Sequence, residues 1–143
     1  MSCSVSSSGP YNADDQQAMR RANSGEIMGR LTTHILDTAN GIPAANVDIH
    51  LYALFGNERL LKASASSNED GRVQGPLLEG DAMQAGTYEL EFATGAYFKA
   101  LGMETGQPAF LDTVVIRFSV AADQHYHVPL LVSPWSYSTY RGS

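Results

Sequence analysis

The segment LTTHILDTANGIPAANVDIHLY, residues 31–52, decides the fold class. Its first six residues are mostly aliphatic or β-branched, and the DTANGIP that follows is rich in turn-forming residues. After the turn, apolar residues occupy every second position: Val47, Ile49, Leu51 and Ala53. Because successive side chains of a strand point to opposite faces, this period of two indicates a half-buried strand. The segment therefore predicts two strands joined by a turn.

The same kind of pattern continues toward the carboxyl end. Further strands are predicted at RLLKASAS (59–66), around Val73, and at GTYELEFATG (86–95), TVVIRFSVA (113–121), HYHVPLLVS (125–133) and WSYSTY (135–140). Pro129 cannot donate a backbone hydrogen bond, so it predicts an edge position, a bulge or a bend in its strand. Only AYFKALGM (96–103) breaks the alternation, and it fits two turns of helix. We therefore expect an all-β fold, a two-sheet antiparallel sandwich of about eight strands with one short helix.

The chain divides into a polar start and one domain. Residues 1–26 are rich in Ser, Asn, Asp and Gln and poor in large aliphatic residues, which predicts a flexible tail. Residues 27–143 are long enough to bury a core without disulfides or metal. The single cysteine, Cys3, cannot close an internal disulfide.

The charge pattern narrows the classes of partner. Nine basic residues against fifteen acidic ones give a net charge of −6, and the basic residues are scattered along the chain. We therefore expect no nucleic-acid partner. The sequence shows neither the features of a secretory signal nor an apolar run of the roughly twenty residues that span a bilayer. No membrane partner is expected.

Histidines are the first candidates for chemistry. His34, His125 and His127 lie in or beside predicted strands, whereas His50 alternates with core residues and is expected on the surface. His125 and His127 would project from one face roughly 7 Å apart. Such a pair could ligate zinc or act on a substrate, but no acidic or cysteine partner follows at ligand spacing, so no metal site is predicted. An imidazole titrating near pH 6.5 suits proton transfer at neutral pH.

Two further features are polar groups in unusual places. Arg72 follows Asp70-Gly71 in an expected tight turn, where it is either a solvated arginine or a group aimed at an anion. The chain closes on SYSTYRGS (136–143). A strand that runs to the last residue would hold the carboxylate of Ser143 in place, where it could orient a histidine or a substrate.

Together these segments carry a family resemblance. LTTHILDTANGIPAANVDIHLY, NEDGRV (68–73), GTYELEFATGAYF (86–98) and HYHVPLLVSPWSYSTYRGS (125–143) resemble, in order and spacing, the 5-hydroxyisourate hydrolases, the enzymatic branch of the transthyretin-like family. The resemblance covers about residues 28–143. Its most specific part is the terminal tetrapeptide Tyr140 to Ser143, which separates these hydrolases from transthyretin, the hormone carrier.

The resemblance implies an activity, an assembly and a site. The activity is hydrolysis of 5-hydroxyisourate to 2-oxo-4-hydroxy-4-carboxy-5-ureidoimidazoline in urate degradation, with no cofactor. The assembly is a homotetramer, a dimer of dimers with active sites at the junction. The catalytic residues are His34, Arg72 and His127, and Tyr140 and Ser143 join His34 and Arg72 in binding substrate. The resemblance assigns no role to His125, and which histidine is the general base stays open.

Small departures and two rival functions accompany the resemblance. Val132 and Trp135-Ser136 differ from the usual family residues without removing a functional group, so they affect only the expected pocket shape. The rivals are a carrier of a small aromatic ligand and a purely structural sandwich; the tetrapeptide argues against the carrier. A cytoplasmic location is expected, with the peroxisome as the alternative, although the ending Arg-Gly-Ser is not a Ser-Lys-Leu type signal.

Overall fold

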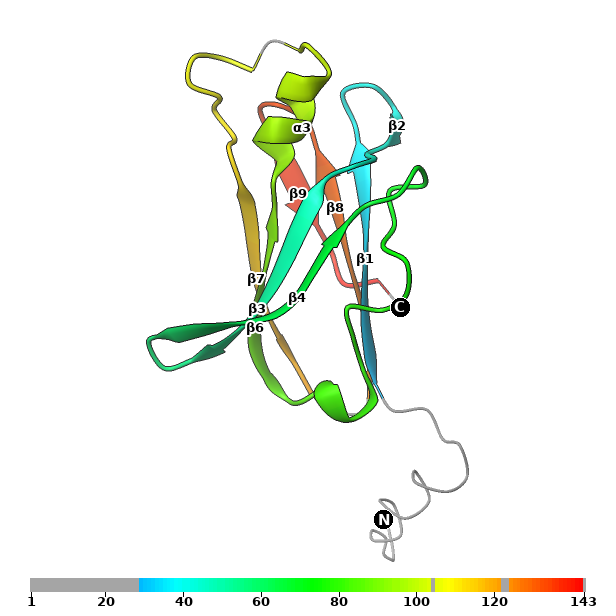
Figure 1. The fold of residues 1–143 in the computed structure, drawn as a ribbon, viewed down its shortest axis with the longest axis vertical. Coiled ribbons are helices and arrows are strands. Elements are labelled where there is room, and N and C mark those ends of the chain that lie inside the picture. Colours follow the sequence, from blue (N-terminus) through cyan, green and yellow to red (C-terminus); the bar gives the residue numbers. More distant parts are fainter. Residues whose placement is uncertain (1–28, 104, 122–123, 143) are drawn as a thin grey trace, which may run out of the picture.

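The computed structural model describes residues 29–103, 105–121 and 124–142 as two β-sheets packed face to face (Figure 1). The tail predicted for residues 1–26 lies outside the described residues. Within them there is no helix whose length and hydropathy would allow it to cross a bilayer.

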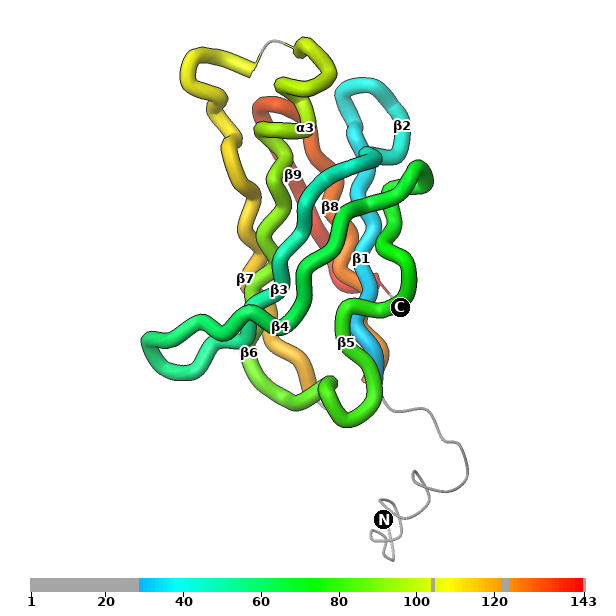
Figure 2. Tube along the Cα trace, in the orientation of Figure 1, coloured from blue at the N-terminus to red at the C-terminus, as the bar shows by residue number. Residues whose placement is uncertain are grey.

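The first sheet carries the chain's earliest and latest strands. Its order is β2-β1-β8-β9, and β5 pairs with the start of β1. The strands are β1 (Arg30–Asp37), β2 (Ile42–Pro43), β5 (Leu78–Glu79), β8 (His125–Val132) and β9 (Tyr137–Thr139). β1 and β8 run parallel, while every other pair within this sheet is antiparallel. The tube in Figure 2 shows these two strands side by side although they come from opposite ends of the sequence.

The second sheet is fully antiparallel and has the order β4-β3-β6-β7. Its strands are β3 (Asp48–Phe55), β4 (Glu58–Ser66), β6 (Gly86–Phe92) and β7 (Val114–Val120). The helix α3 (Thr94–Ala100) follows β6 at one end of the sandwich, and a single 3₁₀ turn, η1 (Gly80–Ala82), precedes β6.

The core forms where the apolar alternations of the two sheets meet. Val47, Ile49, Leu51 and Ala53 are all at most 3% exposed, which confirms the predicted inward face of β3. Leu31 and Ile35 of β1, and Leu130 of β8, are fully buried opposite them. The sandwich fold and the short helix are thus confirmed; the structure divides the strands into nine among its described residues, two of them only two residues long.

One local prediction was wrong, and the structure excludes one of the three alternatives predicted for Pro129. Val73 lies in no strand, and the strand of that region is β5, five residues later. Pro129 does not lie in an edge strand: β8 lies between β1 and β9. Pro129 lies just beyond the part of β8 that pairs with β9, because that register ends at Leu130 and Thr139; the Thr139 hydroxyl donates to the Pro129 carbonyl over 2.7 Å.

Candidate active site

The parallel pairing of β1 and β8 brings two of the predicted site histidines together. The register places Thr32 opposite His127 and His34 opposite Pro129. Their inward-facing neighbours Leu31, Thr33 and Ile35 are buried, so Thr32, His34 and His127 lie on the outer face of this sheet, which we call the histidine face. The two imidazole rings are 6.5 Å apart between centroids and inclined by 35°.

A tight turn holds the backbone of Arg72. The side-chain oxygen of Asn68 accepts hydrogen bonds from the backbone N–H groups of Asp70 (2.9 Å) and Arg72 (3.1 Å). The Asn68 N–H in turn donates to the Arg72 carbonyl, and Gly71 adopts a left-handed φ of 75°. Asn68 therefore organises the Asp-Gly-Arg turn that the sequence predicted.

This turn docks directly on β1. The Ile35 N–H donates to the Gly71 carbonyl over 2.8 Å, and a Cβ atom on residue 71 would lie 2.4 Å from the Ile35 carbonyl oxygen. Only glycine allows so close an approach. The approach forms a bridge between His34 and Arg72, so the structure brings Arg72 beside the histidine pair.

The carboxyl-terminal segment reaches the same place from β9. The Gly142 N–H donates to the His127 carbonyl over 2.7 Å, and a Cβ on residue 142 would lie 2.8 Å from the His127 Cδ2 atom. The glycine of the terminal tetrapeptide thus packs against the imidazole ring of His127. Tyr140 is 60% exposed, and Ser143 lies outside the described residues.

Arg141 anchors this terminal segment to β8. Its guanidinium donates to the carbonyl of His125 and to the side chain of Gln124, both over 3.3 Å. The same group lies 4.2 Å from the centre of the Tyr126 ring, a cation–π contact. Arg141 therefore fastens Gly142 next to His127, and His125 contributes only its backbone to this anchor.

The electrostatics keep both histidines neutral. Burial and then the nearby Arg72 charge lower the pKa of His34, although a hydrogen bond to the backbone of Asp70 and the charge of that residue oppose the change. Burial, Arg72 and His34 lower the pKa of His127. A pKa below the usual 6.5 leaves each imidazole uncharged at pH 7, as a proton acceptor must be.

Each imidazole has one nitrogen fixed by a neighbour. His34 Nε2 lies 3.1 Å from the Asp70 carbonyl oxygen. His127 Nδ1 lies 2.8 Å from Thr32 Oγ1, and of these two residues only His127 was predicted from the sequence. The sequence does show that Thr32 lies two residues before His34, which places both on one face of β1. That Thr32 faces His127 follows only from the register between β1 and β8.

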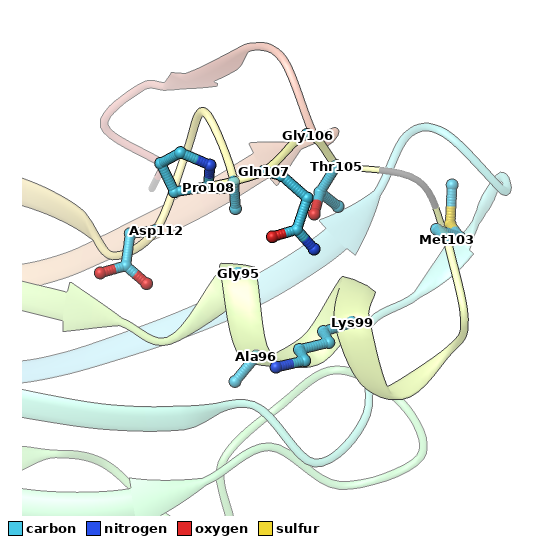
Figure 3. Close-up of a pocket in the computed structure, with 10 residues that line it drawn as sticks. Gly95, Ala96, Lys99, Met103, Thr105, Gly106, Gln107, Pro108 and Asp112 are labelled. Carbon is cyan, nitrogen blue, oxygen red and sulfur yellow. The ribbon is translucent and has the colours of Figure 1, made fainter.

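The rest of the described chain adds no metal-binding cluster to the histidine face, and a hollow elsewhere in the fold is separate from it. No cluster of three or more His, Cys, Asp or Glu side chains suited to a metal occurs among the described residues. A hollow of about 530 Å³ lies beside α3, with Lys99 and Asp112 as its charged lining residues (Figure 3). It contains none of the predicted site residues.

Comparison with known proteins identifies the family. The sequence profile of the HIUase/Transthyretin family matches residues 31–142. The chain belongs to this family. A "5-hydroxyisourate hydrolase" of Ralstonia nicotianae is 59% identical over 117 residues, which are 81% of this chain and 100% of that protein.

Solved structures of relatives have the same fold as this chain. The structure of Klebsiella pneumoniae 5-hydroxyisourate hydrolase matches with a TM-score of 0.68 at 34% identity, over 80% of this chain and 99% of that one. An (S)-allantoin synthase matches with a TM-score of 0.78 at 49% identity over 82% of this chain. The match spans only 44% of the length of the synthase.

Proposed function

We propose that this chain hydrolyses 5-hydroxyisourate to 2-oxo-4-hydroxy-4-carboxy-5-ureidoimidazoline, a step of urate degradation, without a cofactor. One observation carries the proposal: His34, Arg72 and His127 come from β1, a turn and β8, yet meet on the histidine face. The names of the relatives support the substrate, since a hydrolase of that name is 59% identical.

The proposed reaction assigns a task to each residue. Ring opening adds water to an amide-like carbonyl, so it needs a base for the water and a partner for the negative charge on oxygen. A neutral histidine serves as the base, and the Arg72 guanidinium stabilises the oxyanion. No acidic side chain among the described residues forms an ion pair with Arg72, so its charge remains available to a substrate. Tyr140 and Ser143 are proposed to contact the substrate from the terminal segment.

We also propose that the active form is a homotetramer, a dimer of dimers. β7 and β9 each end a sheet, so both present an unpaired edge that a second copy could extend. The histidine face lies outside the core and carries a 60% exposed Tyr140 nearby, which suits a junction between dimers. Light scattering of the purified chain tests this assembly, and a monomeric mass in an active sample would contradict it.

The activity has a direct test. Urate oxidase generates 5-hydroxyisourate in the cuvette, and its ultraviolet decay is followed with and without the chain. We expect decay to accelerate in proportion to the amount of chain added. Decay at the spontaneous rate, from a sample whose circular dichroism shows folded β structure, would overturn the proposed function.

A further inference from the structure

The contact between Thr32 and His127 joins the two histidine-bearing strands across the histidine face. Thr32 Oγ1 and His127 Nδ1 are 2.8 Å apart, a short distance for a hydroxyl–imidazole hydrogen bond. The two residues are 95 positions apart in sequence and stand directly opposite each other in the β1–β8 register. The other edge of the same ring packs against Gly142. The ring is therefore held on two sides, and Nε2 is its remaining polar atom.

Hydrogen-bond accounting limits the Thr32–His127 contact to two arrangements. A neutral imidazole has one N–H and one acceptor nitrogen, while a hydroxyl has a single hydrogen. If His127 Nδ1 donated, the Thr32 hydrogen would need another acceptor, and the described residues offer none. If Thr32 donates to Nδ1, its hydrogen is used and the ring proton lies on Nε2. Each arrangement leaves one donor without a protein partner among the described residues: the Thr32 hydroxyl in the first and the ring Nε2–H in the second. Only the second places that free donor on Nε2, where a substrate oxygen can accept from it.

The partner ring has the opposite arrangement. His34 Nε2 lies 3.1 Å from the carbonyl oxygen of Asp70, which can only accept a hydrogen bond. Nε2 of the neutral His34 ring must therefore carry the proton. Its Nδ1 keeps the lone pair and has no hydrogen-bond partner among the described residues.

We propose that Thr32 is a positioning residue that sets the proton on His127, so that its Nε2 presents an N–H to the substrate while His34 Nδ1 acts as the base. This inference rests on the proposed function and deepens it, because it divides the work between the two histidines. The serine or threonine hydroxyl is the required chemical group, and the strand register is what aims it.

The division of work gives a balanced reaction. The water oxygen bonds to the carbonyl carbon, one water proton passes to His34 Nδ1, and the carbonyl π electrons move to oxygen. The negative oxygen accepts hydrogen bonds from His127 Nε2 and from Arg72. An electron pair of the negative oxygen then re-forms the carbonyl as the carbon–nitrogen bond breaks. The leaving nitrogen takes that bond's electron pair and the proton held by His34, which returns the ring to its neutral form.

The proton position can be measured without any turnover. Selective ¹⁵N labelling of the four histidines distinguishes the protonated from the unprotonated nitrogen of each neutral ring, and a His127→Gln spectrum assigns the signal. We expect the folded wild-type protein at pH 8 to carry the proton of His127 on Nε2. A proton on Nδ1 would overturn the proposal, whether or not the chain hydrolyses 5-hydroxyisourate.

Substitutions connect the proton position to activity. Thr32→Val keeps the shape but removes the hydroxyl, so the Nε2–H form should lose its dominance and kcat should fall about tenfold. Thr32→Ser should restore both. Thr87→Val is the matched control, because Thr87 lies on the outer face of the other sheet, where its hydroxyl makes a hydrogen bond to the Ser119 hydroxyl over 3.1 Å.

The outcomes separate this inference from the activity itself. Turnover and an Nε2 proton in the wild type, both changed by Thr32→Val and restored by Thr32→Ser, support it. A folded Thr32→Val protein with an unchanged ¹⁵N spectrum and a kcat within twofold of wild type would overturn it. So would a Thr32→Ser protein as impaired as the valine variant. Absence of turnover in the wild type would instead contradict the proposed function.

Discussion

The outer faces of the two sheets both carry charged groups, but only the second sheet joins them into a network of ion pairs among the described residues. On the second sheet, Arg117 contacts Glu89 over 2.8 Å, and Arg59 contacts Glu91 over 2.6 Å and Glu89 over 3.2 Å. We call this set the ion-pair face; the Arg59 guanidinium also stacks on Tyr52. Its charges satisfy one another.

The histidine face shows no such network among the residues that the structure describes. Arg72 has no acidic ion-pair partner among the described residues, and its effect is instead to lower the pKa of His34 and His127. A cation beside two imidazoles disfavours their protonated forms. On the proposed function, the substrate completes the histidine face, whereas the ion pairs of the other face form within the folded chain.

Removing one arginine from each face should give the largest contrast. Arg72→Ala should lower kcat/KM for 5-hydroxyisourate by about 100-fold or more, the usual cost of losing an oxyanion partner. Arg117→Ala should leave kcat/KM unchanged and lower the free energy of unfolding by about 1–3 kcal/mol, because the buried Glu89 loses one of its two arginine partners. Steady-state kinetics and urea unfolding check both. Equal effects of the two substitutions on turnover would remove the distinction between the faces.

Displacing one ring of the histidine face should have the next largest effect. In Gly142→Ala the added methyl would lie 2.8 Å from His127 Cδ2, so the ring or the terminal segment must shift. A shift approaching 1 Å should reduce kcat by about 10- to 100-fold. The urea midpoint should change little, because Gly142 lies outside the core. Wild-type kinetics from a folded alanine variant would show that the contact with the ring does not matter.

The acid limb of the pH profile should show the effect of Arg72 on its neighbours. Because the pKa of each histidine lies below 6.5, the neutral forms dominate at pH 7 and above. We expect kcat/KM to stay level down to about pH 6.5 and to fall only as the pH drops through the lowered values. In Arg72→Ala, the titration midpoints of His34 and His127, followed by NMR, should move upward. Unmoved midpoints would mean that Arg72 does not act on these rings.

Loosening the terminal anchor should have the smallest effect. Arg141→Ala removes the cation–π contact with Tyr126 and the hydrogen bond to the His125 carbonyl. Exposed contacts of this kind contribute about 0.5–1 kcal/mol, so kcat/KM should fall about two- to fivefold. Hydrogen exchange at the Gly142 amide should become faster. A loss as large as that of Arg72→Ala would mean that Arg141 itself contacts substrate.

The sequence allowed much of the fold to be predicted because alternation is a local property. The inward positions of β3 followed from period two alone, and their burial confirms them. Strand neighbours are not local, so the position of Pro129 in a strand between two others could not be read from its own segment. Val73 was misplaced because a strand of two residues has no pattern to detect.

The residues of the candidate site could be predicted from the sequence, but the contacts between them could not. The resemblance named His34, Arg72 and His127, and the structure brings them together, while their catalytic roles stay proposals. Nothing in the sequence linked Thr32 to His127, since that contact depends on a register set 95 residues away. Gly142 belonged to a matching tetrapeptide, yet its closeness to His127 appears only in three dimensions.

The parallel pairing of β1 and β8 has a consequence for synthesis. At a translation rate of roughly 5–20 residues per second, the 95 residues that separate Thr32 from His127 take about 5–19 s to follow. Throughout that interval β1 has emerged but its long partner does not yet exist, so most of one strand edge is open to pairing with other chains. The strand that carries His34 therefore needs protection of this edge, for example by a chaperone, until β8 has been made.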